Sequence, residues 1–169
     1  MSVNVVQATS GSELDGVRHL MRSFVAWHRE RHREDLDLID SYFDAAKFEA
    51  ELAGLPGNYA PPAGSLRLAL LGDRPAGCVA LHDLGDGICE MKRMFVPPQD
   101  RGQGVGGSLV GHIIGDARAA GYRLMRLDTS HRQDEAMRLY EKAGFRRVPA
   151  YYPVSPAMAD WLVFFEMPL

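Results

Sequence analysis

Several features that mark specialised classes of protein are scarce or missing in this sequence. Only two of its 169 residues are cysteine, Cys78 and Cys89, and they form neither a metal-binding pair nor a disulfide framework. No apolar run approaches the roughly 20 residues that a membrane-spanning helix needs. Met1–Asn4 has neither the basic nor the apolar region of a signal peptide. We therefore expect reduced thiols in a cytoplasmic protein without a membrane partner.

Basic residues are not in excess, and repeats and low-complexity segments are absent. The chain has 19 Lys and Arg against 22 Asp and Glu, a net charge of −3. A nucleic-acid-binding domain normally carries a basic face or stripe, so the composition argues against a nucleic-acid partner. Apolar residues make up 46% of the chain, which is typical of a globular protein. At this length we predict a single domain spanning residues 1–169.

The spacing of apolar residues, with glycine and proline at the boundaries, predicts a chain of alternating strands and helices. Strands are expected at 3–7, 66–71, 76–84, 91–96, 124–129, 145–148 and 161–167. Helices are expected at 12–32, 42–52, 108–120 and 134–143. Because the strands come in runs that helices interrupt, the pattern indicates an α/β domain with a mixed sheet.

The most informative segment is the glycine-rich turn Arg101–Gly107, which lies between a predicted strand and a predicted helix. Four of the six residues from Gly102 to Gly107 are glycine. The first N–H groups of a helix lack intrahelical partners and lie at the positive end of the helix dipole, so they attract phosphate groups. A connector without a ligand would not need so many glycines, because each costs roughly 0.5–1 kcal/mol relative to alanine inside an element. We therefore expect a phosphate-bearing ligand at this turn.

Two common phosphate sites fit the turn poorly. A P-loop requires a lysine and then Ser or Thr directly after the last glycine, but Ser108 follows Gly107 without a lysine. Residues 102–107 do match the G-x-G-x-x-G pattern of dinucleotide-binding folds, and Asp128 lies about 20 residues further on, where an acid would bind a ribose. However, residues 97–101 separate the turn from its strand, and several elements precede it. A nicotinamide-dependent oxidoreductase is therefore the weaker alternative.

Two separated motifs resemble the GNAT superfamily of N-acetyltransferases. Residues 101–106, Arg-Gly-Gln-Gly-Val-Gly, fit that family's acyl-CoA motif, Gln/Arg-x-x-Gly-x-Gly/Ala. Residues 136–145 are similar to its A-x-x-L-Y-x-x-x-G-F motif. The resemblance covers about residues 66–145. It implies a mixed, mostly antiparallel sheet with a splayed central strand pair flanked by helices. It also implies an acyl-CoA-binding core at about 88–145, with N-terminal helices at about 12–54 contributing to the acceptor site.

The resemblance implies acetyl-CoA as co-substrate and no metal ion. The backbone amides of about Gln103 to Gly107 would hold the pyrophosphate, and Arg101 would add a charged contact. The N–H group near Met94 would lie close to the thioester oxygen. Gln133 occupies a position where family members often carry Asn. The implied cofactor-binding residues are Met94, Phe95, Val96, Arg101, Gly102, Gln103, Gly104, Val105, Gly106, Gly107, Gln133 and Tyr140.

Tyr140 and Glu90 are the candidates for proton transfer. The family counterpart of Tyr140 has its hydroxyl near the sulfur, and a phenol of pKa about 10 can protonate a thiolate whose conjugate acid has a pKa nearer 8.5. The alternative is a core tyrosine. Glu90 would act as the base if burial raises its pKa, and a surface residue paired to lysine is the alternative. Strand alternation predicts that Glu90, Lys92 and Met94 share one face. Other candidate bases are Asp128, Thr129 and His131.

Two further patterns are expected to be structural. His28 and His32 are four residues apart on a predicted helix, but nothing nearby supplies further metal ligands, so we expect a solvated helix end. The aromatic strand 161–165 is most simply a buried last strand, although it would also suit a homodimer interface.

Together these observations predict an N-acetyltransferase that transfers the acetyl group of acetyl-CoA directly to an amine of a small molecule or amino-acid-like acceptor. Two alternatives stay open. One is a protein or peptide N-acetyltransferase, and the other is a CoA-sensing or regulatory module without catalytic activity.

Overall fold

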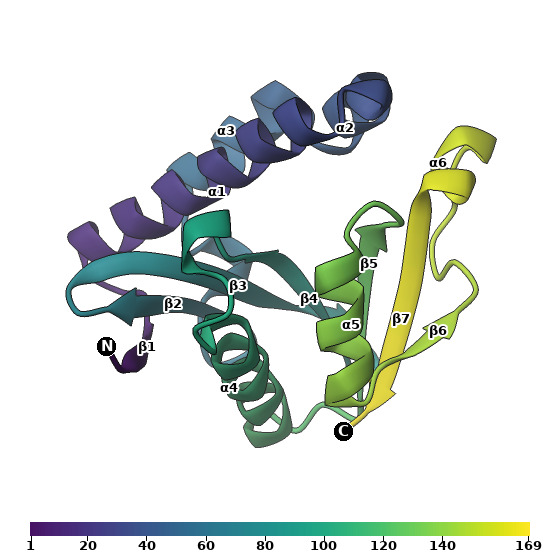
Figure 1. The fold of residues 1–169 in the computed structure, drawn as a ribbon. Helices are drawn as coiled ribbons and strands as arrows, with labels where there is room; N and C mark the ends of the chain where they lie inside the picture. The colour runs from purple at the N-terminus through teal and green to yellow at the C-terminus, as the bar shows by residue number, and fades with distance from the viewer.

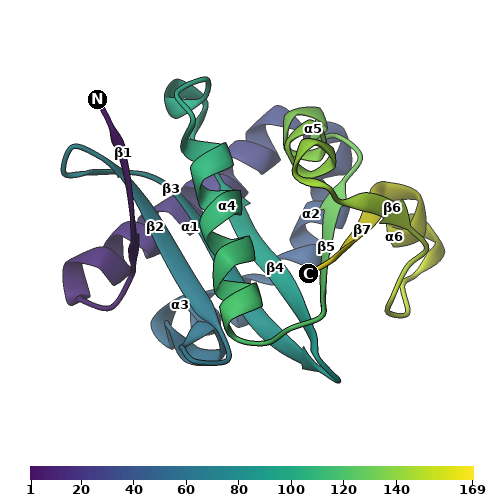
Figure 2. The same cartoon turned by 90° about the horizontal axis from the view of Figure 1, so that it is seen from below.

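The computed structural model describes residues 1–169 and shows a central sheet with helices on both faces (Figures 1 and 2). The strands are β1 (Val3–Gln7), β2 (Ser65–Leu71), β3 (Arg74–Gly85), β4 (Ile88–Phe95), β5 (Leu124–Ser130), β6 (Arg146–Val148) and β7 (Leu162–Pro168). The helices are α1 (Gly11–Arg31), α2 (Leu36–Tyr42), α3 (Ala45–Ala53), α4 (Val105–Ala119), α5 (Asp134–Ala143) and α6 (Pro156–Trp161). Short 3-10 helices are η1 (Arg33–Asp35), η2 (Gly57–Tyr59) and η3 (Pro98–Asp100). None of the helices combines the length and the apolar character that crossing a membrane requires.

All seven predicted strands are present, and the ends of all four predicted helices lie within three residues of the expected ones. The helix predicted over residues 42–52 begins three residues later than expected. Helix α2 ends at Tyr42, and α3 begins only after Asp44, whose side chain accepts a hydrogen bond from the Lys47 N–H and so caps the new helix. The sequence pattern predicts neither α2 nor α6, which are seven and six residues long and too short to show helical periodicity.

The sheet is mixed and mostly antiparallel, as the resemblance implied. Its strand order is β1-β2-β3-β4-β5-β7-β6, and only β4 and β5 run parallel to each other. These two central strands pair over three residues alone, from Ile88 opposite Leu124 to Glu90 opposite Arg126. Beyond Glu90 the two strands have no further pairing. This is the splayed strand pair that the sequence led us to expect.

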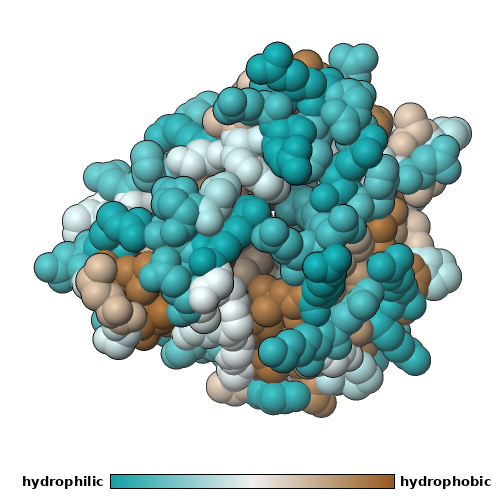
Figure 3. Space-filling model, viewed as in Figure 1, coloured by the Kyte–Doolittle hydropathy of each residue, from teal (hydrophilic) through white to brown (hydrophobic).

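Each face of the sheet packs against its own layer of helices (Figure 2). Helices α4 and α5 cover one face, where the buried cluster includes Val79, Leu81, Met91, Leu109, Ile113 and Leu127. Helices α1, α2 and α3 lie over the other face, where the cluster includes Leu20, Phe24, Leu68, Ala80, Phe95 and Trp161. The aromatic residues of the last strand are buried within the chain, as their simplest interpretation predicted. Hydrophilic residues dominate the face drawn in Figure 3.

A β-bulge interrupts β4 just where it leaves β5. Ala80 of β3 pairs with Lys92, whereas Cys78, two residues back, pairs with Phe95, so β4 has one extra residue at Arg93 and Met94. The Arg93 backbone has a φ of 58°, which is unusual for a residue with a side chain. The extra residue reverses the alternation of β4. Met94 therefore packs on the α4 side, and the prediction that Glu90, Lys92 and Met94 share one face is wrong.

Helix α3 holds the bulge in place through the Arg93 side chain. The guanidinium group donates two hydrogen bonds to the Glu51 carboxylate, at 2.8 and 2.9 Å. It also lies over the rings of Phe43 and Phe48, at 5.2 and 5.4 Å from their centroids. Only 11% of the Arg93 side chain is exposed. The ion pair is therefore poorly screened by water, and it joins α3 to the point where the sheet opens.

The C-terminal end of α1 is buried, and the expectation of a solvated helix end for His28 and His32 is wrong. The two side chains are 1% and 8% exposed, and their Nδ1 atoms are hydrogen-bonded at 2.9 Å. The Trp161 indole stacks on His28, with ring centroids 5.7 Å apart. Burial, followed by the neighbouring His32, lowers the pKa of His28 to about 4. Helix α6 provides this cover, and the sequence pattern did not predict that helix.

Replacing Glu51 should destabilise the fold, whereas replacing its neighbour Glu49 should not, because only Glu51 pairs with a buried arginine. Glu51→Gln leaves the charge of Arg93 buried without its counter-ion, so we expect the free energy of unfolding to fall by about 2 kcal/mol. Glu49 also pairs with an arginine, Arg22, but both side chains are more than half exposed. Glu49→Gln should therefore leave stability unchanged. Urea unfolding followed by circular dichroism measures both, and equal effects would contradict the account.

The buried His28 should make stability depend on pH. Its pKa is lower in the folded chain than in the unfolded chain, so the unfolded chain binds the proton more readily. The stabilisation is complete above about pH 6.5 and is lost as the pH falls, by up to about 3 kcal/mol near pH 4. Urea unfolding of wild type and His28→Gln across this range isolates the effect. The exposed His19→Gln on the same helix should keep the wild-type pH dependence, and a wild-type profile for His28→Gln would contradict the prediction.

Candidate functional site

The glycine-rich turn presents unpaired backbone amides to solvent at the start of α4. Gly102 and Gly104 have φ values of 75° and 82°, a conformation that side chains disfavour, and Gly104 is the residue that precedes the helix. A backbone hydrogen bond runs from the Ser108 N–H to the Gly104 carbonyl at 3.0 Å. The N–H groups of Val105, Gly106 and Gly107 therefore precede the helical ladder and are available to an anion.

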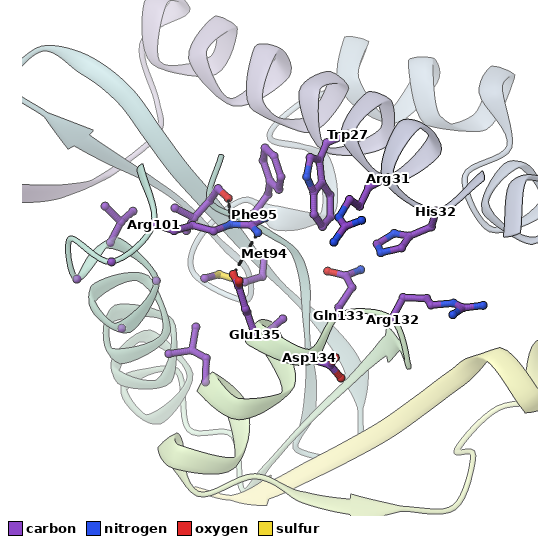
Figure 4. A pocket seen from close by; sticks show the side chains of 18 residues that line it. Trp27, Arg31, His32, Met94, Phe95, Arg101, Arg132, Gln133, Asp134 and Glu135 are labelled. Atoms are coloured by element: carbon purple, nitrogen blue, oxygen red, sulfur yellow. Dashed lines mark hydrogen bonds and ion pairs between the residues drawn. The ribbon is translucent and has the colours of Figure 1, made fainter. Parts of the chain in front are cut away.

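A cavity of about 410 Å³ lies in front of this turn (Figure 4). It is bounded by the turn, the end of β4, the start of α5 and the end of α1. Ten of the twelve predicted cofactor-binding residues line it: Met94, Phe95, Val96, Arg101, Gly102, Gly104, Val105, Gly106, Gly107 and Gln133. Gln103 is in the turn but its side chain lies outside the cavity, with its Nε2 atom 3.5 Å from the Gln99 carbonyl oxygen. Tyr140 lines a neighbouring cavity instead.

Besides Gln133, α1 and the β5–α5 connection contribute residues to this cavity that sequence reasoning did not assign to the cofactor. They are Trp27, which the sequence suggested only for an acceptor pocket, and Arg31, His32 and Arg132 (Figure 4). The Arg101 guanidinium lies over the Trp27 ring, at 4.7 Å, and donates hydrogen bonds to the Val96 carbonyl and the Glu135 carboxylate, at 2.9 and 3.1 Å. No local sequence signal marks these residues, because only the folded sheet brings the end of α1 opposite the turn.

The charge of the large cavity favours an anionic ligand. Arg31, Arg101 and Arg132 line it in a chain whose net charge is −3, and Arg132 is paired with Glu34 and Asp35 at its edge. Asp134 and Glu135 also line it, but Glu135 is already paired with Arg101. Guanidinium groups match the geometry of phosphate oxygens, and the amides of the turn add further donors. The cavity therefore suits an extended ligand with several phosphate groups.

A second cavity, of about 50 Å³, lies where β4 and β5 separate. It shares Met94 and Gln133 with the large cavity, so these two residues mark the boundary between the cavities. Its wall includes the phenol of Tyr140, which is itself buried and packs edge-on against Phe145 and Phe165. Burial, with a contribution from the charge of Asp128, raises the pKa of Tyr140. The phenol therefore keeps its proton at neutral pH and can donate it.

Glu90 is buried and fully hydrogen-bonded, on the α1 side of the sheet. Its Oε1 atom accepts a hydrogen bond from His82 at 2.7 Å and lies 3.8 Å from Lys92 Nζ, and the Tyr151 hydroxyl donates to Oε2. Burial alone would raise its pKa, but His82, Lys92 and Tyr151 outweigh burial and lower it. The condition that burial raise the pKa of Glu90 is therefore not met. Glu90 is ionised at neutral pH.

Asp128 forms a second, partly buried carboxylate site on the same side of the sheet. The hydroxyl of Tyr42 donates to Oδ1, and that of Tyr152 donates to Oδ2 at 2.5 Å. Lys92 Nζ donates to the Tyr42 hydroxyl at 3.3 Å and so links the two carboxylates. Asp128, Lys92 and Thr129 line the small cavity, whereas Glu90 does not. Of the candidate bases from the sequence, His131 is exposed in the loop before α5.

Comparison with known proteins agrees with this geometry. The profile of the acetyltransferase (GNAT) family matches residues 19–145. An uncharacterized N-acetyltransferase of Schizosaccharomyces pombe is 42% identical over 104 residues, which cover 60% of this chain and 64% of the relative. An IAA acetyltransferase of Azospirillum brasilense is 38% identical over 94 residues, which cover 55% of this chain and 60% of the relative. The chain thus spans less than two thirds of the length of these relatives.

A solved structure extends the likeness to the whole fold. The PaiA N-acetyltransferase of Thermoplasma acidophilum, determined in complex with coenzyme A, covers 100% of both chains with a TM-score of 0.73 at 15% sequence identity. At this identity the likeness concerns the fold alone. The family profile covers three quarters of the chain and includes both the glycine-rich turn and the tyrosine helix α5. This chain belongs to the acetyltransferase (GNAT) family.

Proposed function

We propose that this chain is an acetyl-CoA-dependent N-acetyltransferase whose acceptor is the amine of a small molecule or an amino-acid-like compound. One observation carries the proposal. The phosphate-attracting cavity at the turn continues, across Met94 and Gln133, into the small cavity that Tyr140 lines. A ligand with phosphates at one end and a reactive group at the other fits this path, because each end meets the chemistry that it requires.

The cofactor would be held by three parts of the chain. The amides of Val105–Gly107 and the guanidinium groups around the large cavity would bind the pyrophosphate. The backbone of Met94–Val96 lies beyond the last pair between β4 and β5, so its polar groups on that side have no strand partner. An extended ligand arm can add to such an open edge by hydrogen bonds with the backbone. Arg101 would exchange its contact with Glu135 for a phosphate.

The transfer itself needs a proton donor, a proton acceptor and a group that stabilises the oxyanion. The acceptor nitrogen forms a bond to the thioester carbon, and the carbon–sulfur bond breaks. Tyr140 would donate its proton to the thiolate as negative charge builds on the sulfur, and its raised pKa keeps the phenol protonated until then. The N–H group of Met94 would donate a hydrogen bond to the carbonyl oxygen as it gains negative charge.

Glu90 would take the first proton from the acceptor through water, because it lines neither cavity. Its lowered pKa keeps the carboxylate ionised, so that it attracts an ammonium group, but the lowering also makes it a weaker base. The hydrogen bond from His82 links this carboxylate to the neighbouring strand β3. Asp128 supplies a second negative charge on the same side of the sheet, which also favours a cationic acceptor.

The surroundings of the two carboxylates support a small acceptor. Phenol groups enclose them. Tyr42 is the last residue of α2, and Tyr151 and Tyr152 lie in the connection between β6 and α6. Aromatic rings beside carboxylates suit an ammonium group, and the Lys92 ammonium lies 5.4 Å from the centroid of the Tyr42 ring. A peptide would require these tyrosines to move apart.

Replacing Tyr140 tests the catalytic proposal directly. Release of CoA from acetyl-CoA is measured with a panel of primary amines, namely 2-phenylethylamine, putrescine, glycinamide and lysine. Tyr140→Phe removes only the hydroxyl, so we expect kcat to fall about 100-fold while the Kd for acetyl-CoA from titration calorimetry stays unchanged. Tyr122→Phe is the matched control, because its hydroxyl donates to the Ala63 carbonyl at a distance from both cavities.

Each outcome of this experiment has a separate meaning. Full activity of Tyr140→Phe would contradict the role of the phenol as proton donor. A wild type that binds acetyl-CoA but acetylates none of these amines, and does acetylate a peptide, would contradict the small-molecule acceptor. A wild type that binds acetyl-CoA without turning over any amine or peptide would instead indicate a CoA-sensing module.

A further inference from the structure

The two buried histidines of α1 connect the two cavities of the site. His28 lines the small cavity together with Tyr140 and Asp128, and His32 lines the large cavity together with Gln133 and Arg132. Their Nδ1 atoms are hydrogen-bonded to each other at 2.9 Å. The Nε2 atom is then the remaining nitrogen of each ring. A continuous pair of imidazoles therefore runs from the enclosed end of the site towards its open end.

The proposed reaction has to move protons out of the enclosed end. An ammonium acceptor begins with three hydrogens on nitrogen and ends, as an amide, with one. The sulfur takes one proton from Tyr140, and Tyr140 regains one from solvent. Two protons leave the nitrogen and one enters from solvent, so each turnover releases one proton overall. The first of the two would pass through water to Glu90, which lies outside the small cavity, and the second becomes acidic once nitrogen is bonded to the carbonyl carbon.

We propose, on the basis of the proposed function, that His28 and His32 form a proton relay that carries this second proton from the small cavity to the edge of the large one. In the hydrogen bond between them one Nδ1 donates and the other accepts. With His28 as donor, its Nε2 has a free lone pair, and the ring lines the small cavity in which the acceptor nitrogen would react. When Nε2 takes the proton, Nδ1–H passes its own to His32 Nδ1, and His32 releases one from Nε2. Each ring then carries its proton on the other nitrogen, and it has to rotate or exchange that proton before the next turnover.

The surroundings of the pair suit this role better than either carboxylate does. Both oxygens of Glu90 and of Asp128 already accept hydrogen bonds, whereas the His28 ring is uncharged between turnovers because burial lowers its pKa to about 4. A protonated His28 would be short-lived there, which favours passing the proton onward.

The charged groups around the pair are close to balanced. Asp35 accepts hydrogen bonds from Trp161 and Arg132, at 3.1 and 3.0 Å. It therefore holds in place the indole that stacks on His28. Glu34 lies 3.5 Å from Arg132, and Arg31 lines the large cavity next to His32 (Figure 4). Two acids and two arginines thus lie around His32. Their charges cancel, so the surroundings do not trap a proton on its ring.

The relay is tested on the complete chain with acetyl-CoA and the amine of the panel that wild type acetylates fastest. His28→Gln and His32→Gln should each lower kcat at least about 10-fold, with the KM for acetyl-CoA little changed. Because both residues serve one path, the double variant should lose no more than either single variant. His19→Gln, an exposed histidine of the same helix, is the control and should keep the wild-type kcat.

Two further measurements test the relay, and the first of them separates it from a merely structural pair. Imidazole added to His32→Ala should restore kcat in a saturable way, because the removed ring faces the large cavity. Nitrogen-15 spectra of the imidazoles should show opposite tautomers for His28 and His32, and this readout needs no acceptor and no variant. Wild-type kcat in both single variants, additive losses in the double variant, absence of rescue or identical tautomers would each overturn the relay. An inactive wild type would overturn the proposed function instead, and the relay with it.

Discussion

The ion pair between Arg93 and Glu51 is the interaction on which the rest of the site depends. It holds a bulge in β4 at the residue where β4 and β5 have already ceased to pair. Without the extra residue, Met94 would face the helices α1 to α3 together with Glu90 and Lys92. With it, Met94 faces α4 and the glycine-rich turn, while Lys92 and Arg93 stay with the carboxylate cluster. One strand thereby serves two chemically different sides of the sheet.

The two sides differ in charge as well as in position. On the side of the turn, three guanidinium groups and the amides at the start of α4 favour phosphate. On the other side, the buried carboxylate of Glu90 and the partly buried one of Asp128, both held by tyrosine hydroxyls, favour an ammonium group. A donor and an acceptor of opposite charge would therefore meet at the opening between β4 and β5. The net charge of the chain conceals this separation, because acids and bases almost cancel over the whole sequence.

Local patterns predicted part of this arrangement, and long-range contacts decided the rest. The glycine-rich turn and the tyrosine helix are contiguous motifs, so their elements and their order could be read from the sequence. The bulge at Arg93 could not, because it depends on Glu51 and Phe48 of α3 and on Phe43, which lies between α2 and α3. The burial of His28 and His32 also escaped prediction, since it requires Trp161 from α6. Likewise the partners of Glu90 come from β3 and from the connection after β6, and they reversed the expected direction of its pKa shift.

The central claim is that acetyl-CoA binds along the end of β4 that has left β5, with its phosphates at the turn. Hydrogen–deuterium exchange of the complete chain, measured with and without acetyl-CoA, tests it most directly. The account predicts slower exchange of the backbone amides at residues 94–96 and 103–107, and unchanged exchange in the paired strands β1 and β2, which lie at the far edge of the sheet. Protection that is absent from both segments, or that appears only elsewhere in the chain, would contradict the account.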